Sequence, residues 1–289
     1  TIGILREKYP EDELYLVVGT DMFLSFREWH EYKYLLDNCT LAVLSRETDD
    51  RGEILSFKRS LENEDGARIR LIEHEPLPMS SAEIRAMLPK AGGAELLDDG
   101  VYSLIIKNRW YAAMPELRWL REKVRPYLTE KRARHVAGCE EQAVKLAWRW
   151  GADVYEAAEA GILHDITKKL SDEEQLIMCD KYGIILDAAE RRNPRILHAR
   201  TGAALARELF GIPDGIYSAI RWHTTGKPDM SLMEKIIYLA DFTEPTRDFE
   251  GVEPLRKLCF EDIDRAMELG LRMSLEEIRS RGEDAYKDT

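Results

Sequence analysis

The amino-acid sequence predicts two domains, an α/β domain followed by an all-α helical bundle. Strand patterns alternate with helix patterns up to about residue 112, as in an α/β layer fold. From about residue 115 the strand patterns disappear, and apolar residues recur at helical spacing. The 289 residues suffice for two domains of ordinary size. We place the boundary at the Pro-containing segment YAAMPE, which gives domains over 1–113 and 114–289.

Three strands and a helix carry the α/β prediction. LYLVVGTDM (14–22) is a continuous β-branched run, typical of a buried parallel strand. CTLAVLSRE (39–47) and ARIRLIEHE (67–75) predict two further strands. SSAEIRAML (80–88) predicts a helix, because it begins with a serine and a glutamate at capping-box spacing.

The second domain is expected to be a bundle of helices. Gly-Ile-Pro and Thr-Gly-Lys-Pro segments interrupt the helical periodicity and mark the ends of helices. The expected helices cover residues 133–150, 154–164, 198–210, 215–223 and 232–242.

Composition excludes several functional classes. A net charge of −12 argues against a nucleic-acid surface, which needs excess Lys and Arg. No apolar run approaches the roughly 20 residues that cross a bilayer, and the N-terminus has no signal-peptide pattern. The four cysteines form no C-x-x-C pair, so we expect a reducing, cytoplasmic setting.

Histidines and aspartates recur at the ends of the apolar helices. The set comprises His135, His164, Asp165, His198, His223 and Asp241. A single buried histidine is more often a hydrogen-bonded core residue, but neutral imidazole and carboxylate together are ligands for Fe, Mn, Zn or Ni. A helical bundle can direct such side chains to one interior point. The long spacings between successive members fit one ligand per helix, and the sequence therefore predicts a metal site inside the bundle.

The order H…HD…H…H…D, with a lysine three residues after HD, resembles the HD superfamily of metal-dependent phosphohydrolases. ILHARTGA, IRWHTTGKPDMSLMEKIIYLADFTEPTR and DFEGVEPLR are similar to the HD-domain family that splits diadenosine tetraphosphate into two ADP. This resemblance covers roughly residues 118–285. It implies two divalent or trivalent transition-metal ions, with iron favoured over Mn, Co, Ni or Zn.

The resemblance also implies roles for individual residues. One metal ion would be held by His135, His164, Asp165 and Asp241, and a second by Asp165, His198 and His223. Asp165 and Lys168 would be catalytic. Substrate contacts are expected from Lys168, Arg200, Thr224, Thr225, Glu244 and Arg247, for which a solvated or capping role is the alternative. Glu244 is also a candidate to orient a metal ligand.

The first domain resembles the C-terminal part of bacterial nicotinate mononucleotide adenylyltransferase, a Rossmann-like fold. The resemblance rests on VVGTDMFLSFREWHEYKYLLDNCTLAVLSRE, LPMSSAEIRAML and LLDDGVYSLIIKNRWY, and it implies a nucleotide site at Gly19, Asp21, Trp29, Ser80, Ser81 and Arg85. The family's His-x-Gly-His motif does not occur in the sequence. Because this motif stabilises charge on the transferred phosphate, we expect an incomplete domain with no adenylyl transfer of its own, either part of a larger bifunctional protein or degenerate.

Two other functions stay open. The helical domain could act on mononucleotides, or it could be a non-catalytic nucleotide sensor that regulates the adenylyltransferase. We expect a nucleotide as the partner, with no nucleic acid and no membrane, and we allow for a homodimer.

Overall fold

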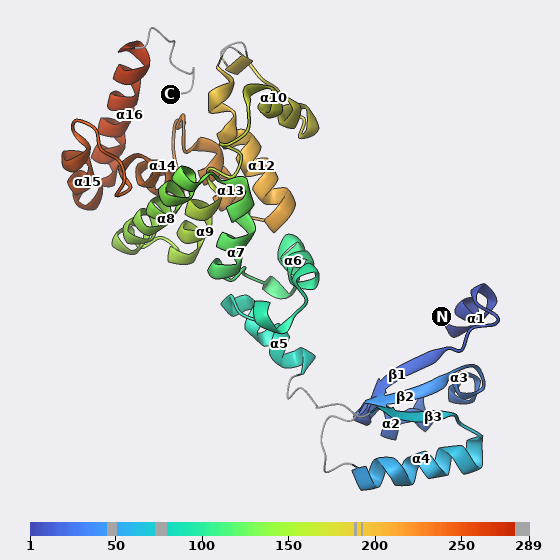
Figure 1. Ribbon diagram of the computed structural model, residues 1–289. Coiled ribbons are helices and arrows are strands. Elements are labelled where there is room, and N and C mark those ends of the chain that lie inside the picture. Colours follow the sequence, from blue (N-terminus) through green and yellow to red (C-terminus); the bar gives the residue numbers. More distant parts are fainter. Residues whose placement is uncertain (45–50, 73–79, 188–189, 192, 281–289) are drawn as a thin grey trace. The chain divides into compact units, whose positions relative to one another are not determined.

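A computed structural model describes residues 1–44, 51–72, 80–187, 190–191 and 193–280. The chain forms two compact units, Thr1–Ser81 and Ala82–Thr289 (Figure 1). Each unit has an apolar core of its own.

The first unit is a small parallel sheet with helices between its strands. The strands pair in the order β1-β2-β3, and both pairs are parallel, as the sequence predicts. The elements are α1 (Ile2–Lys8), β1 (Tyr15–Gly19), α2 (Thr20–Leu24), α3 (Tyr32–Asn38), β2 (Thr40–Leu44), α4 (Arg51–Asp65) and β3 (Ile69–Ile72).

One face of this sheet carries the core of the first unit. Val18, Leu41 and Ile69 pack in the same core as Phe23 and the other apolar residues of the helices. On the opposite face, Val17 of β1 is 60% exposed. The prediction that β1 is a buried strand is therefore wrong at Val17, because the core of this unit covers only the face of the sheet that carries Val18, Leu41 and Ile69.

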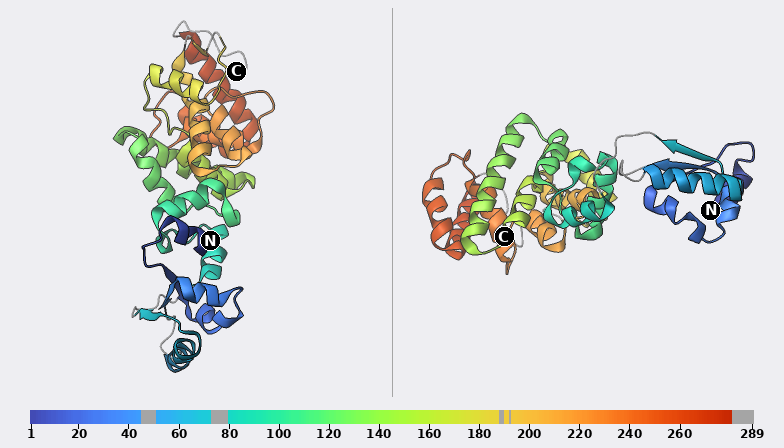
Figure 2. Two further views of the ribbon diagram at one scale, coloured as in Figure 1. Left: turned by 90° about the vertical axis from the view of Figure 1, so that its right-hand side faces the viewer. Right: turned by 90° about the horizontal axis from the view of Figure 1, so that it is seen from below.

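The second unit is helical, and its described residues contain no strand. Its helices gather around one apolar core (Figure 2). They are α5 (Ser81–Met87, which begins at the end of the first unit), α6 (Asp99–Asn108), α7 (Leu117–Val124), α8 (Glu130–Trp150), α9 (Val154–Leu163), α10 (Asp172–Lys181), α12 (His198–Phe210), α13 (Asp214–Trp222), α14 (Leu232–Thr243), α15 (Val252–Glu261) and α16 (Ile263–Ser280). The five expected helices are confirmed as α8, α9, α12, α13 and α14.

Helices α8 and α9 form the centre of this unit. Thr129 caps the start of α8 by accepting a hydrogen bond from the Arg132 amide, and Gly151 ends the helix with a left-handed backbone at φ 72°. The two helices approach closely at Gly161, where a Cβ atom would lie 2.8 Å from the Cα of Glu140. This close approach positions the end of α9 against the side of α8.

Helix α6 belongs to the helical unit by its contacts. Tyr102 and Ile106 are fully buried in the same core as Leu120 of α7. The first compact unit accordingly ends at Ser81. In the sequence, by contrast, the resemblance to the adenylyltransferase ends near residue 113, and the resemblance to the HD-domain family begins after it. The boundary at residue 113 stays a prediction. No helix among the described residues is long and apolar enough to cross a membrane.

Candidate metal centre

Six side chains from five helices meet inside the second unit. His135 lies on α8, His164 and Asp165 end α9, His198 begins α12, His223 ends α13, and Asp241 lies on α14. Neighbouring imidazole rings lie 5.0 to 5.3 Å apart between centroids. All of these residues except Asp241 are buried. The structure thus brings together all six ligands that the sequence predicts.

The sequence of α9 explains why a His-Asp pair lies in the interior. Asp153 caps the N-terminus of the helix, and every residue from Ala157 to Leu163 is buried. The helix therefore runs into the core, and the two residues that follow it, His164 and Asp165, enter the core as well.

The carboxylate of Asp165 lies between two pairs of histidines. Its Oδ2 atom is 3.6 Å from His135 Nε2 and 3.5 Å from His164 Nε2. Its Oδ1 atom is 3.4 Å from His198 Nε2 and 3.7 Å from His223 Nε2. Each carboxylate oxygen thus faces a different pair of imidazoles.

Backbone carbonyls orient three of the rings. The Nδ1 atoms of His164, His198 and His223 lie 2.8, 2.6 and 2.6 Å from carbonyl oxygens three residues earlier in the chain. A carbonyl only accepts, so each Nδ1 carries a proton and each Nε2 is left to face the centre. All three Nε2 atoms point to Asp165.

A carboxylate does the same for the fourth ring. The Oε1 atom of Glu244 is 3.0 Å from His135 Nδ1, and Glu244 is fully buried. This contact leaves His135 Nε2 free, 2.9 Å from Asp241 Oδ1. The sequence placed Glu244 among the substrate contacts or as an orienting group, and its geometry favours orientation of His135.

The donor set fits transition-metal ions. The Nε2 atoms of His135 and His164 are 3.3 Å apart, and those of His198 and His223 are 3.2 Å apart. Nitrogen ligands about 2.0–2.1 Å from one ion are separated from each other by roughly 3 Å. Imidazole and carboxylate together suit Fe, Mn, Co, Ni and Zn. Two ligand groups, His135 with His164 and Asp241, and His164 with Asp165 and His223, have donor atoms close enough for one ion each.

The pKa shifts favour the metal-binding form at Asp165 and His198. At His164, burial lowers the pKa, but Cys139 and Asp165 raise it well above its usual value, so a metal ion would replace a proton there. Burial raises the pKa of Asp165, but the charge and hydrogen bond of His164 outweigh burial and lower this pKa well below its usual range. Burial and the nearby Lys168 ammonium lower the pKa of His198 to about 3, so its ring is neutral. Ionised carboxylate and neutral imidazole are the forms that bind metal.

Three cationic side chains border the centre, each against one of its ligands. Arg132 donates to Asp165 Oδ2 at 2.6 Å, and Arg247 donates to Asp241 Oδ1 at 2.6 Å. The Lys168 ammonium lies 3.2 Å from both ring nitrogens of His198, and burial lowers its pKa. Sequence reasoning missed Arg132. The signal was its position three residues before His135, on the same face of α8.

The remaining predicted substrate residues divide into two groups. Thr224 joins the centre, with Oγ1 3.1 Å from His198 Nε2. Thr225 donates to the carbonyl of Gly226. Arg200 pairs with Glu190 at 2.6 Å, so its contacts join α12 to the segment before it.

The nucleotide site expected in the first half of the chain stays a prediction. Gly19 ends β1, Asp21 lies in α2, and Trp29 packs on Phe26 at 5.1 Å between ring centroids. The Arg85 guanidinium lies 5.3 Å from the centroid of the Tyr111 ring.

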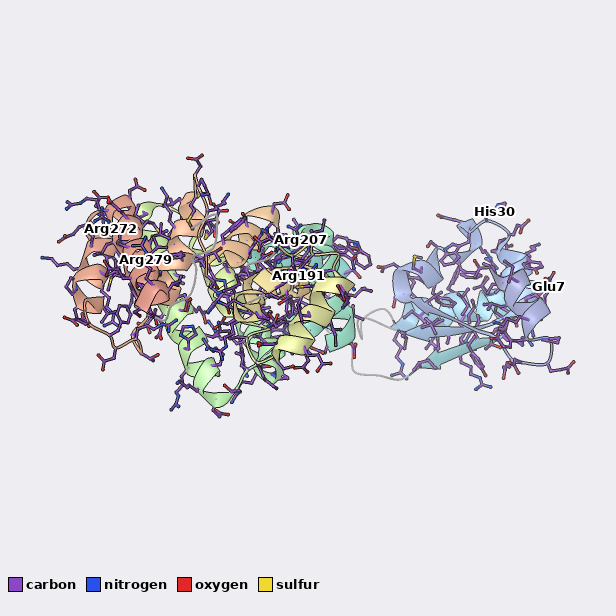
Figure 3. The ribbon with its side chains drawn as sticks, turned by 90° about the horizontal axis from the view of Figure 1, so that it is seen from above. Glu7, His30, Arg191, Arg207, Arg272 and Arg279 are labelled. Carbon is purple, nitrogen blue, oxygen red and sulfur yellow. The ribbon has the colours of Figure 1, made fainter. Side chains whose placement is uncertain are left out.

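Ser80 and Ser81 end the first unit, whereas Arg85 belongs to the second. The His30 side chain is 94% exposed (Figure 3), and His74 is outside the described residues.

Comparison with known proteins decides the family. The HD domain family matches residues 132–246, a segment that contains all six candidate ligands. A symmetrical bis(5'-nucleosyl)-tetraphosphatase of Bacillus subtilis is 38% identical over 170 residues, which cover 57% of this chain and 89% of the relative. The chain belongs to the HD-domain family.

Two further relatives extend this result. A crystal structure of a predicted HD superfamily hydrolase involved in NAD metabolism, from Clostridium acetobutylicum, is similar to this HD-domain protein. Its TM-score is 0.57 at 37% identity, with 59% of this chain and 90% of that chain covered. A probable nicotinate-nucleotide adenylyltransferase/Ap4A hydrolase of Mycoplasma genitalium is 25% identical over 94% of this chain and 73% of its own length. The HD domain is thus fused to an adenylyltransferase-like region, as in that relative.

Proposed function

We propose that this chain hydrolyses dinucleoside polyphosphates at a two-metal centre, splitting diadenosine tetraphosphate symmetrically into two ADP. The observation that carries the proposal is the position of Asp165, whose two carboxylate oxygens face two separate pairs of histidines. Relatives named as symmetrical tetraphosphatases support the choice of substrate.

The ligands divide between two ions. His135, His164, Asp165 and Asp241 would hold one ion, and Asp165, His198 and His223 the other. We favour iron from the family resemblance, although Mn, Co, Ni and Zn suit the same donors. When bound, such ions supply a water of lowered pKa and neutralise charge on the attacked phosphoryl group.

The protein's own residues provide position and charge. Glu244 and the backbone carbonyls hold the imidazoles in one tautomer, which keeps every Nε2 aimed at the centre. Arg132, Lys168 and Arg247 lie where substrate phosphates would approach, and each can exchange its present partner for a phosphate oxygen. Cleavage of a phosphoanhydride depends chiefly on such positioning and charge neutralisation.

We further propose that residues 1–113 are the C-terminal part of a Rossmann-like nucleotidyltransferase domain. The parallel order β1-β2-β3 with intervening helices is compatible with such a fold. Similarity to relatives named as probable nicotinate-nucleotide adenylyltransferases supports the assignment. We assign no adenylyl transfer to this chain alone, because its sequence lacks the His-x-Gly-His motif.

The first experiment combines elemental analysis with product analysis. Purified chain is expected to bind about two transition-metal ions and to convert diadenosine tetraphosphate to ADP alone. Formation of AMP and ATP would contradict symmetrical cleavage. A chain that stays inert with iron or manganese would support the sensor alternative. Preferred turnover of mononucleotides would support the other enzymatic alternative.

Single substitutions test the ligand set. His164→Ala and Asp165→Ala should abolish turnover and lower the metal content while the helical circular dichroism is retained. His30→Ala is the matched control, because its side chain is 94% exposed. Full turnover in both ligand variants would remove the metal-catalysis proposal.

A further inference from the structure

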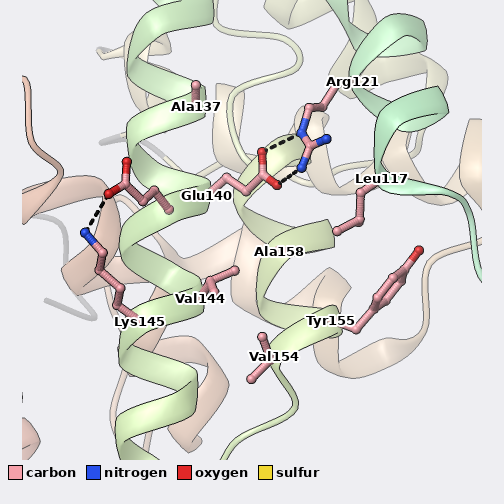
Figure 4. A pocket seen from close by; sticks show the side chains of 10 residues that line it. Leu117, Arg121, Ala137, Glu140, Val144, Lys145, Val154, Tyr155 and Ala158 are labelled. Atoms are coloured by element: carbon pink, nitrogen blue, oxygen red, sulfur yellow. Dashed lines mark hydrogen bonds and ion pairs between the residues drawn. The ribbon is translucent and has the colours of Figure 1, made fainter.

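The outer face of α8 carries an apolar groove that the proposed reaction does not use. The groove has a volume of about 670 Å³ and lies between α7, α8 and α9 (Figure 4). A second hollow of about 390 Å³ shares Val144, Lys145 and Val154 with it and extends to Trp148. We call the two hollows together the α8 groove.

A large aromatic side chain projects beside this groove. Trp148 is 79% exposed, and the neighbouring Val154 is 38% exposed. Tryptophan is enriched at the centres of protein interfaces, where its burial contributes much of the binding energy. A projecting indole next to an apolar hollow is therefore suited to contact with another protein surface.

The exposed stripe of α8 is complementary to itself. Ala137, Glu141, Val144 and Trp148 follow one another at spacings of four, three and four residues, so they lie on one face of the helix. If two copies of α8 pack antiparallel about a twofold axis near Ala143, the small Ala137 comes opposite the partner's Trp148. The hollow around Ala137 can then receive the indole.

The charged residues beside this stripe also match in the antiparallel arrangement. Glu141 and Lys145 lie on the same flank of the stripe, with side chains 57% and 50% exposed, and they pair within the helix at 2.5 Å. The twofold axis near Ala143 brings Glu141 opposite the partner's Lys145, and this contact occurs twice. The first pairing places the axis between residues 142 and 143, and the second places it at Ala143, so the two registers agree to within half a residue.

From this double match we infer that the α8 groove is a homodimer interface between two copies of this chain, with α8 packed antiparallel on α8 about a twofold axis near Ala143. We choose a second copy of the chain as the occupant of the α8 groove. In an isologous interface both copies use the same surface, so that surface must be complementary to itself, as the exposed face of α8 is. The inference is independent of the proposed hydrolysis, since Trp148 and Lys145 take no part in the metal centre.

Sedimentation velocity tests the dimer directly. The full chain should be dimeric across about 1–100 µM, and Trp148→Glu should weaken association at least about tenfold. Ile185→Glu is the matched control, because Ile185 is 87% exposed in the same unit but outside the groove. A monomeric wild-type chain, or an unchanged dimer in Trp148→Glu, would overturn the inference.

A charge exchange tests the register. Lys145→Glu should weaken the dimer, because it places acidic groups opposite one another. Glu141→Lys combined with Lys145→Glu should restore it, because both the contact across the axis and the pair within the helix are re-formed. Failure of the double variant to recover would rule out this register.

Cross-linking provides a second readout of the register. The four native cysteines are buried, so an introduced surface cysteine can be labelled selectively. Mixed Glu141→Cys and Lys145→Cys chains should be joined by a short bismaleimide more efficiently than either chain alone. Equal cross-linking in all three samples would contradict the twofold axis near Ala143.

Discussion

The Nε2 atoms of His135 and His164 face each other at 3.3 Å inside the helical unit. The Nδ1 atoms of these rings bond to Glu244 and to the carbonyl of Gly161, so both Nε2 atoms point to the same place. Burial lowers the pKa of His164, but the neighbouring Cys139 and Asp165 raise it well above its usual value, so a proton occupies this place without metal. A metal ion would replace that proton and hold both nitrogens. The relationship therefore leads to a prediction about stability as well as activity.

Metal binding should stabilise the helical unit. Adding iron or manganese to chelator-treated chain should raise the melting temperature, because a ligand at a thousand times its Kd adds about 4 kcal/mol to the unfolding free energy. Differential scanning calorimetry measures the shift. The Asp165→Ala variant should show little of it, and an equal shift in that variant would contradict binding at this centre.

Glu244→Gln should weaken metal binding about 10- to 100-fold, because His135 loses its anionic hydrogen-bond partner. Competition with a chromophoric chelator measures the affinity. Glu253→Gln serves as control, since the Glu253 side chain on α15 is 76% exposed and pairs only with Arg256 among the described residues. Equal affinity in both variants would show that Glu244 does not act through His135.

Arg132→Met should lower kcat/KM for diadenosine tetraphosphate by at least about tenfold, because a charged hydrogen bond to phosphate is worth roughly 1.5–3 kcal/mol. The metal content should stay unchanged. Steady-state kinetics and elemental analysis on the same sample separate the two effects. Arg134→Met, at an exposed position on the same helix, should retain full activity. A matching loss in both variants would contradict a specific role for Arg132.

Acid should destabilise the chain through Glu234. Burial raises the pKa of this carboxyl, but hydrogen bonds from Ser218 and Ser231 and the Lys227 ammonium lower it below its ordinary 4.5. A lowered folded-state pKa adds stability above pH 4.5 that is lost as the pH falls through the folded value.

The comparison with Glu234→Gln isolates this contribution. In metal-free chain, the variant should be about 1–3 kcal/mol less stable at pH 7, and the two curves should converge in acid. Urea unfolding at several pH values measures both. A pH-independent difference would show that the carboxylate charge is not responsible.

Gly161→Ala should destabilise the helical unit by about 1–3 kcal/mol, because the added Cβ would lie 2.8 Å from the Glu140 backbone. Gly215→Ala is the control, since a Cβ there has no neighbour within 4 Å among the described residues. That change should be neutral or stabilising in α13. Denaturant unfolding measures both, and equal stability would show that α8 and α9 can separate without cost.

Local pattern sufficed for much of the fold and for the choice of candidate ligands. Five helices of the second unit follow from apolar spacing and Gly/Pro breaks, because these signals act within a few residues. The three parallel strands could likewise be predicted from local sequence pattern, but the exposure of Val17 could not. Exposure of a sheet face depends on which other elements pack on it rather than on the strand's own residues.

The sequence by itself determined which residues are candidates for binding metal and nucleotide, through residue type, order and family resemblance. Only the tertiary structure decided how they are used. In the structure, Asp165 lies between two histidine pairs, and Glu244 contacts His135. Arg200 pairs with Glu190, and Arg132 donates a hydrogen bond to Asp165. The physical reason is that hydrogen bonds and charge contacts act over about 3 Å, and such proximity between residues far apart in sequence arises only when the helices pack.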